Sequence, residues 1–195
     1  MDQSLSFATR ATGLVTLMLL TGNLVLGIAT AGRASRPSWP RFALAALHRN
    51  ISLLAVLFLG VHVSTSIIDP GAGVRWLDAL VPFLSDDRPL WLGLGTVALD
   101  LLLAAIATSM LRTRLSFRMW RGVHWAAYAS WPAALIHGAV FGDEDNGLSW
   151  VIGLYISCIV AVALALLWRR RSTRYPSTRY PPTPAHRRAA MHGGR

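Results

Sequence analysis

Apolar residues in this chain come in long uninterrupted blocks rather than at the short period of a soluble fold. Almost no charge falls within five stretches, which are 11–32, 42–68, 89–111, 122–142 and 146–168. Each stretch holds the roughly 20 residues that an α-helix needs to cross the hydrocarbon layer. Because a helix satisfies its backbone polar groups internally, the pattern predicts an all-α integral membrane helical bundle with five transmembrane helices.

Charge in the connecting segments predicts the orientation. Segments 32–41 and 112–121 contain arginine and no acid, whereas 143–148 is acidic and 69–88 has more acids than bases. The positive-inside rule then puts the N-terminus outside and the C-terminus in the cytoplasm. All 19 basic residues are arginine, which is typical of a high-GC bacterial genome, so we expect a bacterial cell membrane. Ala29-Thr30-Ala31 has the form of a signal-peptidase site, but Met1–Ser6 has no base, which favours an uncleaved helix.

The C-terminal segment has a different composition. Residues 172–176 and 177–181 repeat Ser-Thr-Arg-Tyr-Pro, and eight arginines follow residue 168. We therefore expect a transmembrane domain over 1–168 and a disordered, basic, Pro/Arg-rich cytoplasmic tail over 169–195. The net charge of +10 thus reflects topology and lipid contact rather than nucleic-acid binding. The single cysteine, Cys158, is expected to be a small buried residue.

Four of the six histidines lie inside the apolar stretches, in two matched pairs. His48 and His62 are fourteen residues apart on the second stretch, and His124 and His137 are thirteen apart on the fourth. Ionisable residues within a bilayer are costly and are candidates for function. One such histidine is often just hydrogen-bonded to a neighbouring helix, but two matched pairs favour ligation.

The positions of these histidines along their helices predict their partners. His62 lies seven residues before Asp69 and His137 six before Asp143, so the two match in height to within roughly 3 Å. His48 and His124 match in the same way, about 20 Å nearer the cytoplasm. Two opposed imidazoles suit the two axial positions of a haem iron, whereas zinc requires four ligands around one centre.

One spacing is unfavourable on an ideal helix. Fourteen residues return to within about 40° of the same face, but thirteen leave about 140° of error. Pro132 lies between His124 and His137, and proline distorts a helix. We expect this distortion to help aim His137.

The pattern His48-x13-His62 and His124-x12-His137 on alternate spans resembles the ferric reductase-like transmembrane domain over roughly residues 11–168. That family includes NADPH oxidases, iron reductases and the haem subunit of the periplasmic methionine sulfoxide reductase system. The resemblance implies two b-type haems, with His48 and His124 on the inner iron and His62 and His137 on the outer iron. It also implies that electrons pass outward.

Two departures from the family pattern affect the expected partners. The chain shows no flavin- and NADPH-binding domain after the last span, and five spans are predicted where six are common. The electron donor is then a separate flavin-containing reductase or quinol, and a partner protein is a possible source of a sixth helix.

Other polar and aromatic residues have candidate supporting roles. Arg49, Arg118 and Arg121 lie at the inner level, where they either pair with haem propionates or only fix topology. Trp131 lies midway between His124 and His137, as a spacer between haems or as packing. Asp100 is expected to form a structural hydrogen bond with Asn23, Asn50 or Arg49, or to relay protons.

We therefore expect a haem-containing electron-transfer subunit of an oxidoreductase that delivers electrons to ferric iron, oxygen or an outer partner protein. The first alternative is a non-catalytic haem-binding sensor or assembly protein. A small proton-coupled transporter that uses Asp100 is a weaker alternative, because no inverted repeat is evident.

Overall fold

The fold is described by a computed structural model over residues 2–31, 40–141 and 149–173. Its α-helices are α1 (Asp2–Ala31), α2 (Arg41–Ile68), α3 (Pro89–Met110), α4 (Phe117–Phe141) and α5 (Ser149–Thr173). A short 3₁₀ helix, η1 (Pro70–Ala72), follows α2. These residues contain no strand, so the expectation of an all-α membrane bundle is confirmed.

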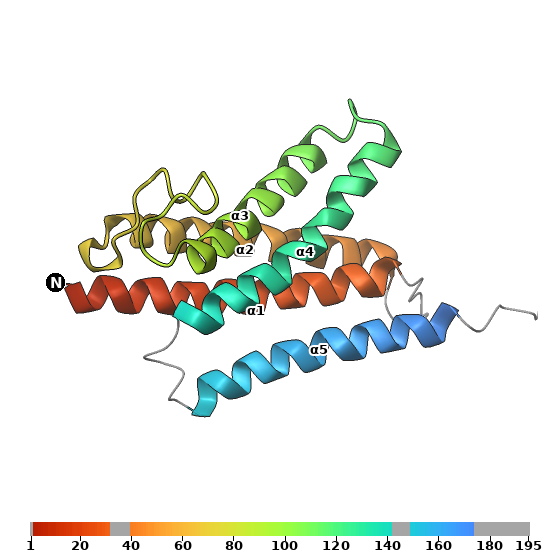
Figure 1. The fold of residues 1–195 in the computed structure, drawn as a ribbon. Helices are drawn as coiled ribbons and strands as arrows, with labels where there is room; N and C mark the ends of the chain where they lie inside the picture. Colours follow the sequence, from red (N-terminus) through yellow and green to blue (C-terminus); the bar gives the residue numbers. More distant parts are fainter. Residues whose placement is uncertain (1, 32–39, 142–148, 174–195) are drawn as a thin grey trace, which may run out of the picture.

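Two helical hairpins and one further helix make up the bundle. Helix α1 packs along α2, and α3 packs along α4, while α1 also meets α4 and α5 (Figure 1). Several of the most buried side chains belong to α1, among them Leu17, Leu20 and Ile28. Helix α1 therefore packs on three other helices, α2, α4 and α5.

Side-chain size divides each helix between the bundle and its surroundings. Small residues such as Ala55, Ala98 and Ala133 are buried, whereas large apolar residues such as Leu57 and Leu164 are exposed. Small residues let helices approach closely inside a bilayer, where apolar surface facing outward meets lipid. This distribution is the one expected of a membrane protein and the reverse of a soluble one.

Four of the helices, α1, α2, α3 and α5, are long and apolar enough to cross a membrane. Helix α4 has 25 residues and runs beside α3, but it does not meet that standard of apolarity. The physical reason is its content of Arg118, Arg121, His124 and His137. The expected five helices are present, and the fifth span at α4 stays a prediction.

The helix ends differ from the expected stretches at two places. Helix α1 begins at Asp2 rather than near residue 11, and α5 continues to Thr173. Residues 169–173 are therefore helical, and the division between a transmembrane domain and a disordered tail stays a prediction. Arg170 and Arg171 occupy the last turn, where positive charge is favourable beside the free carbonyls. Segments 32–39, 142–148 and 174–195, which hold much of the charge used for orientation, lie outside the described residues.

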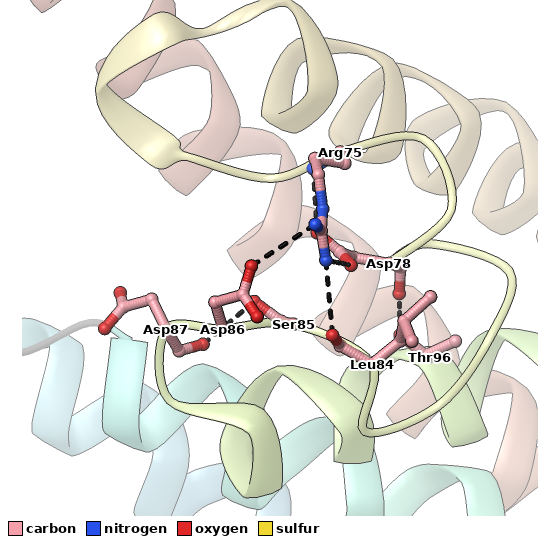
Figure 2. Close-up of polar contacts among 7 residues, drawn as sticks. All are labelled: Arg75, Asp78, Leu84, Ser85, Asp86, Asp87 and Thr96. Atoms are coloured by element: carbon pink, nitrogen blue, oxygen red, sulfur yellow. Dashed lines mark hydrogen bonds and ion pairs between the residues drawn. The ribbon is translucent and has the colours of Figure 1, made fainter.

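The connection between α2 and α3 folds back over the end of the bundle. The Asp78 carboxylate accepts hydrogen bonds from the Arg75 backbone N–H (3.0 Å), Nε (3.2 Å) and Nη2 (2.9 Å). The Thr96 hydroxyl on α3 donates to the Asp78 carbonyl at 2.7 Å, as Figure 2 shows. Arg75 also reaches the Leu84 carbonyl and the Asp86 carboxylate. This loop consists of η1 and turns, not an amphipathic helix, and its polar network fixes it to α3.

The loop also requires a glycine on α3. A Cβ at Gly93 would lie 2.2 Å from Cδ1 of Phe83, so no other residue fits without moving the loop. Phe83 itself has a positive φ of 64°, which is uncommon for an aromatic residue. Close packing of the loop on α3 therefore depends on Gly93.

We expect Asp78→Asn to loosen this loop, because its hydrogen bonds with Arg75 hold the pKa of the Asp78 carboxyl below its ordinary range. A carboxyl with a lowered pKa stabilises the fold above about pH 4, and that contribution is lost as pH falls further. Limited proteolysis of the loop should thus accelerate several-fold in Asp78→Asn at neutral pH, and in the parent protein near pH 3.

Asp86→Asn is the matched control, because the Asp86 side chain is 92% exposed and exposed ion pairs contribute little. Equal protease resistance of Asp78→Asn and Asp86→Asn would show that the buried network does not hold the loop.

Candidate functional site

The four intramembrane histidines meet in two pairs across the bundle. The ring centroids of His62 and His137 lie 6.4 Å apart, with 82° between the ring planes. Those of His48 and His124 are also 6.4 Å apart, with 63° between the planes. We call His62 and His137 the loop-side pair, because the 69–88 loop lies at that end, and His48 and His124 the far-side pair. Both pairings are the ones expected from the heights in the sequence.

The two helices that carry the histidines leave room between them. Helices α2 and α4 do not pack closely through their backbones, unlike α1 with α2 or α3 with α4. The imidazole rings reach across this gap. A metal ion bound at about 2 Å by one nitrogen of each ring would separate the ring centres by about 6 Å. The observed spacing therefore fits one metal ion between each pair of imidazoles.

Backbone carbonyls orient the loop-side rings. Nδ1 of His62 lies 2.9 Å from the Thr9 carbonyl on α1, and Nδ1 of His137 lies 3.0 Å from the Trp91 carbonyl on α3. A carbonyl only accepts, so Nδ1–H is the donor in each neutral ring, and the lone pair is left on Nε2. This arrangement is typical of histidines that bind a metal, whose second nitrogen is held by an acceptor.

The far-side rings have a different environment. Nδ1 of His124 and Nε1 of Trp120 are buried and have no hydrogen-bond partner among the described residues. Nδ1 of His48 is also buried without a hydrogen bond, although the Asn23 backbone interacts with that ring. The Trp120 indole stacks on His124 at 5.2 Å, and the Arg112 guanidinium lies 4.7 Å from the Trp120 ring. Buried nitrogens without a hydrogen bond destabilise the fold. Their presence at the far-side level is consistent with a group that binds to these imidazoles.

A tilted ring contact lies at the other end of α4. The Phe141 ring is 5.0 Å from His137, and the Arg88 guanidinium is 5.8 Å from Phe141. Trp120 lies four residues before His124, and Phe141 lies four residues after His137. Each aromatic residue therefore shares a helix face with the histidine it contacts. Each α4 histidine therefore has an aromatic neighbour on the side toward its end of the helix, and an arginine beyond it.

A cavity of about 670 Å³ surrounds the loop-side pair. Its lining is mostly apolar and comes from all five α-helices and the 69–88 loop, and it includes Arg10, His62, Asp78, His137 and Tyr155. The volume lies within the range of about 300–1,000 Å³ typical of cofactor sites. An apolar cavity with two convergent imidazoles suits a large planar cofactor such as haem.

The arginines proposed for propionates lie at the far-side level but on the surface. Arg49, Arg118 and Arg121 are all exposed. The Arg121 guanidinium lies 5.4 Å from the Phe117 ring. Arg49 follows His48 directly, so its side chain points about 100° away around the helix. A role for these arginines in binding propionates stays a prediction.

Trp131 lies between the two histidine levels and is fixed to α1. Its Nε1–H donates to the Thr21 hydroxyl at 2.8 Å, which in turn donates to the Leu17 carbonyl at 2.8 Å. Asn23, one of the three expected partners of Asp100, exchanges hydrogen bonds with Ser52 on α2. A bond of Asp100 to Asn50 or Arg49, or a role in proton relay, stays a prediction.

Helix α4 passes through Pro132 without interruption, and its axis changes direction along its length (Figure 1). Both α4 histidines face α2 despite their thirteen-residue spacing. The part that Pro132 plays in aiming His137 stays a prediction.

Several residues at the site had no part in the sequence expectations. The Thr9 and Trp91 carbonyls carry no sequence signal, since every residue has one. Gly13 and Gly95, which lie against the loop-side imidazoles, do carry a signal, because glycine inside an apolar helix often marks a close approach. Trp120 and Phe141 are visible as aromatic residues four positions from a histidine.

No group of three or more His, Cys, Asp or Glu side chains suited to a metal ion occurs within residues 2–31, 40–141 and 149–173. The site is thus a set of imidazole pairs, which matches axial ligation better than a tetrahedral metal site. Fold and site together define a helical membrane protein with two stacked bis-imidazole positions.

Residues 12–136 match the family described as the ferric reductase-like transmembrane component, which is well over half of the chain. The chain belongs to this family, whose members typically bind haem, and membership points to electron transfer across a membrane. The match includes His48, His62 and His124 and ends one residue before His137. No curated protein and no solved structure matches the chain.

The Trp131 anchor generates a stability prediction. Thr21→Val removes the acceptor of the indole N–H, and the free energy of unfolding of this variant should be lower by about 1 kcal/mol. Thr21→Ser keeps the hydroxyl and should retain most of the stability. Thermal unfolding in detergent measures both, and identical midpoints for Val and Ser would show that the hydrogen bond contributes nothing.

Proposed function

We propose that this chain holds two b-type haems, one between His48 and His124 and one between His62 and His137, and conducts electrons across the cell membrane. The observation that carries the proposal is the repeated 6.4 Å separation of opposed imidazoles at two levels of one bundle. A single pair might be a coincidence of packing. Two pairs with the same separation, in a chain of this family, support two bound groups of the same kind, which we propose are haems.

The protein's own groups determine what each site can do. At each level two imidazoles would hold the haem iron, which would leave the iron no open position for a substrate. When bound, haem iron supplies reversible one-electron exchange. The apolar cavity and the Nδ1–H donors of the loop-side pair exclude water and fix the rings. This chemistry suits a conductor better than a catalyst of bond-making.

Orientation and partners follow from the charge pattern. With the positive loops in the cytoplasm, the far-side pair is the inner one and the loop-side pair the outer one. Electrons then enter from a separate flavin-containing reductase or from quinol, near the exposed arginines of 112–121. They leave near the 69–88 loop toward ferric iron, oxygen or an outer partner protein.

Replacing single histidines tests the haem assignment. Purified protein should contain about two haems per chain with low-spin spectra in a reduced-minus-oxidised measurement. His62→Ala or His137→Ala should remove the loop-side haem and retain the other, and His48→Ala or His124→Ala should do the reverse. His186 is a histidine outside the apolar stretches, so His186→Ala is the matched control and should keep both haems.

The outcomes separate the proposed function from its alternatives. Protein that stays colourless after haem-sufficient expression would overturn the proposal and turn attention to transport. Loss of both haems in every variant, with helicity retained, would contradict separate levels.

The donor is tested in membrane vesicles that contain the protein. Quinol or a flavin reductase with NADPH should reduce the haems within seconds, and an impermeant ferric chelate on the opposite side should reoxidise them. Haem that neither donor reduces would favour the non-catalytic sensor. Reoxidation only from the side of the 112–121 loop would reverse the proposed orientation.

A further inference from the structure

We propose that Gly13 and Gly95 are positioning residues that place the two loop-side imidazoles and thereby set the electronic properties of the loop-side level. The proposal rests on the function proposed above, in that the imidazoles are taken to bind haem iron. Its structural basis, however, is present in the chain itself and does not require the cofactor.

The same local arrangement occurs on α1 and on α3. His62 donates to the carbonyl of Thr9, and Gly13 is four residues further along α1. His137 donates to the carbonyl of Trp91, and Gly95 is four residues further along α3. In an α-helix the N–H of residue i+4 is already bonded to carbonyl i. Each carbonyl therefore accepts a second bond, for which it has a second lone pair.

A side chain at the fourth residue would occupy the space of the ring. A Cβ at Gly13 would lie 3.0 Å from Cε1 and 3.1 Å from Nδ1 of His62. At Gly95 it would lie 2.7 Å from both Cε1 and Nδ1 of His137. The imidazole can thus reach the carbonyl only where glycine leaves the helix surface open. We call each carbonyl with its glycine a glycine notch.

Not every helical glycine lies this close to a side chain. A Cβ at Gly22 on α1 or Gly60 on α2 would meet nothing within 4 Å. At the far-side level, the Asn23 backbone interacts with His48 and Gly27 is four residues further along α1, but a Cβ there would stay 3.9 Å from Cε1 of His48. Nδ1 of His48 and Nδ1 of His124 make no hydrogen bond among the described residues. Both notches serve the loop-side pair, one for each ring.

The notches have an electronic consequence. An imidazole whose N–H is held by a carbonyl is more basic and is fixed in tautomer and orientation. A more basic axial ligand stabilises the ferric state, so the notches lower the reduction potential of the loop-side haem. They also fix the 82° angle between its ring planes, which governs the g-values of a low-spin ferric centre.

The test compares alanine variants of the full-length protein. Gly95→Ala should shift the g-values of the loop-side haem and raise its potential, and Gly13→Ala should do so less, following the 2.7 Å and 3.0 Å contacts. In both variants the far-side haem should keep its signal. Redox titration and electron paramagnetic resonance measure the two haems separately.

Two control variants separate positioning from general damage. Gly22→Ala lies on the same helix as Gly13 in open space and should leave both haems unchanged. Gly93→Ala, two residues from Gly95, would meet Phe83 rather than His137, so it should loosen the loop without moving the g-values. Shifts of equal size in Gly93→Ala and Gly95→Ala would overturn the proposal, as would unchanged spectra in both Gly13→Ala and Gly95→Ala.

A measurement without haem distinguishes failure of this inference from failure of the proposed function. In haem-free protein, ¹⁵N NMR should show the Nδ1–H tautomer for His62 and His137, and Gly95→Ala should change the His137 signal. If no preparation binds haem but this tautomer pattern holds, the notches stand and the electron-transfer function falls. An Nε2–H tautomer at both residues would overturn the notches themselves.

Discussion

Opposed imidazoles across the gap between α2 and α4 are the interaction on which the rest of this structure depends. The backbones of these helices stay apart, and the rings meet at the same 6.4 Å separation at two levels. Four ionisable rings inside an apolar bundle are costly unless something uses them. The packing of α1 on α2 and of α3 on α4 holds the rings where they face each other.

The two levels share one geometry but differ in how their rings are held. Each loop-side ring is hydrogen-bonded to a backbone carbonyl of a neighbouring helix. Nδ1 of each far-side ring, in contrast, makes no hydrogen bond within the described part of the chain, and the His124 ring stacks on Trp120. Unlike ring environments would give the two proposed haems different reduction potentials. The asymmetry in ring environment is therefore as relevant to function as the repeated spacing.

The loop between α2 and α3 links the stability of the fold to the site. The Asp78 carboxylate accepts a hydrogen bond from the Arg75 guanidinium. Asp78 also lines the cavity around the loop-side pair. Phe83 packs against Gly93, which lies two residues before Gly95, the glycine that faces His137. The polar network in this loop thus closes the end of the bundle where electrons are proposed to leave.

The sequence by itself determined the helical membrane fold and the pairing of histidines, because apolar length and a rise of 1.5 Å per residue are properties of each helix alone. It did not determine the helix ends at Asp2 and Thr173, where charge is accommodated beyond the apolar stretch. Only the tertiary structure decided that Asn23 bonds Ser52, that Trp131 bonds Thr21, and which carbonyls hold His62 and His137. These contacts join residues from different helices, and which atoms meet depends on how the helices are rotated and packed against each other.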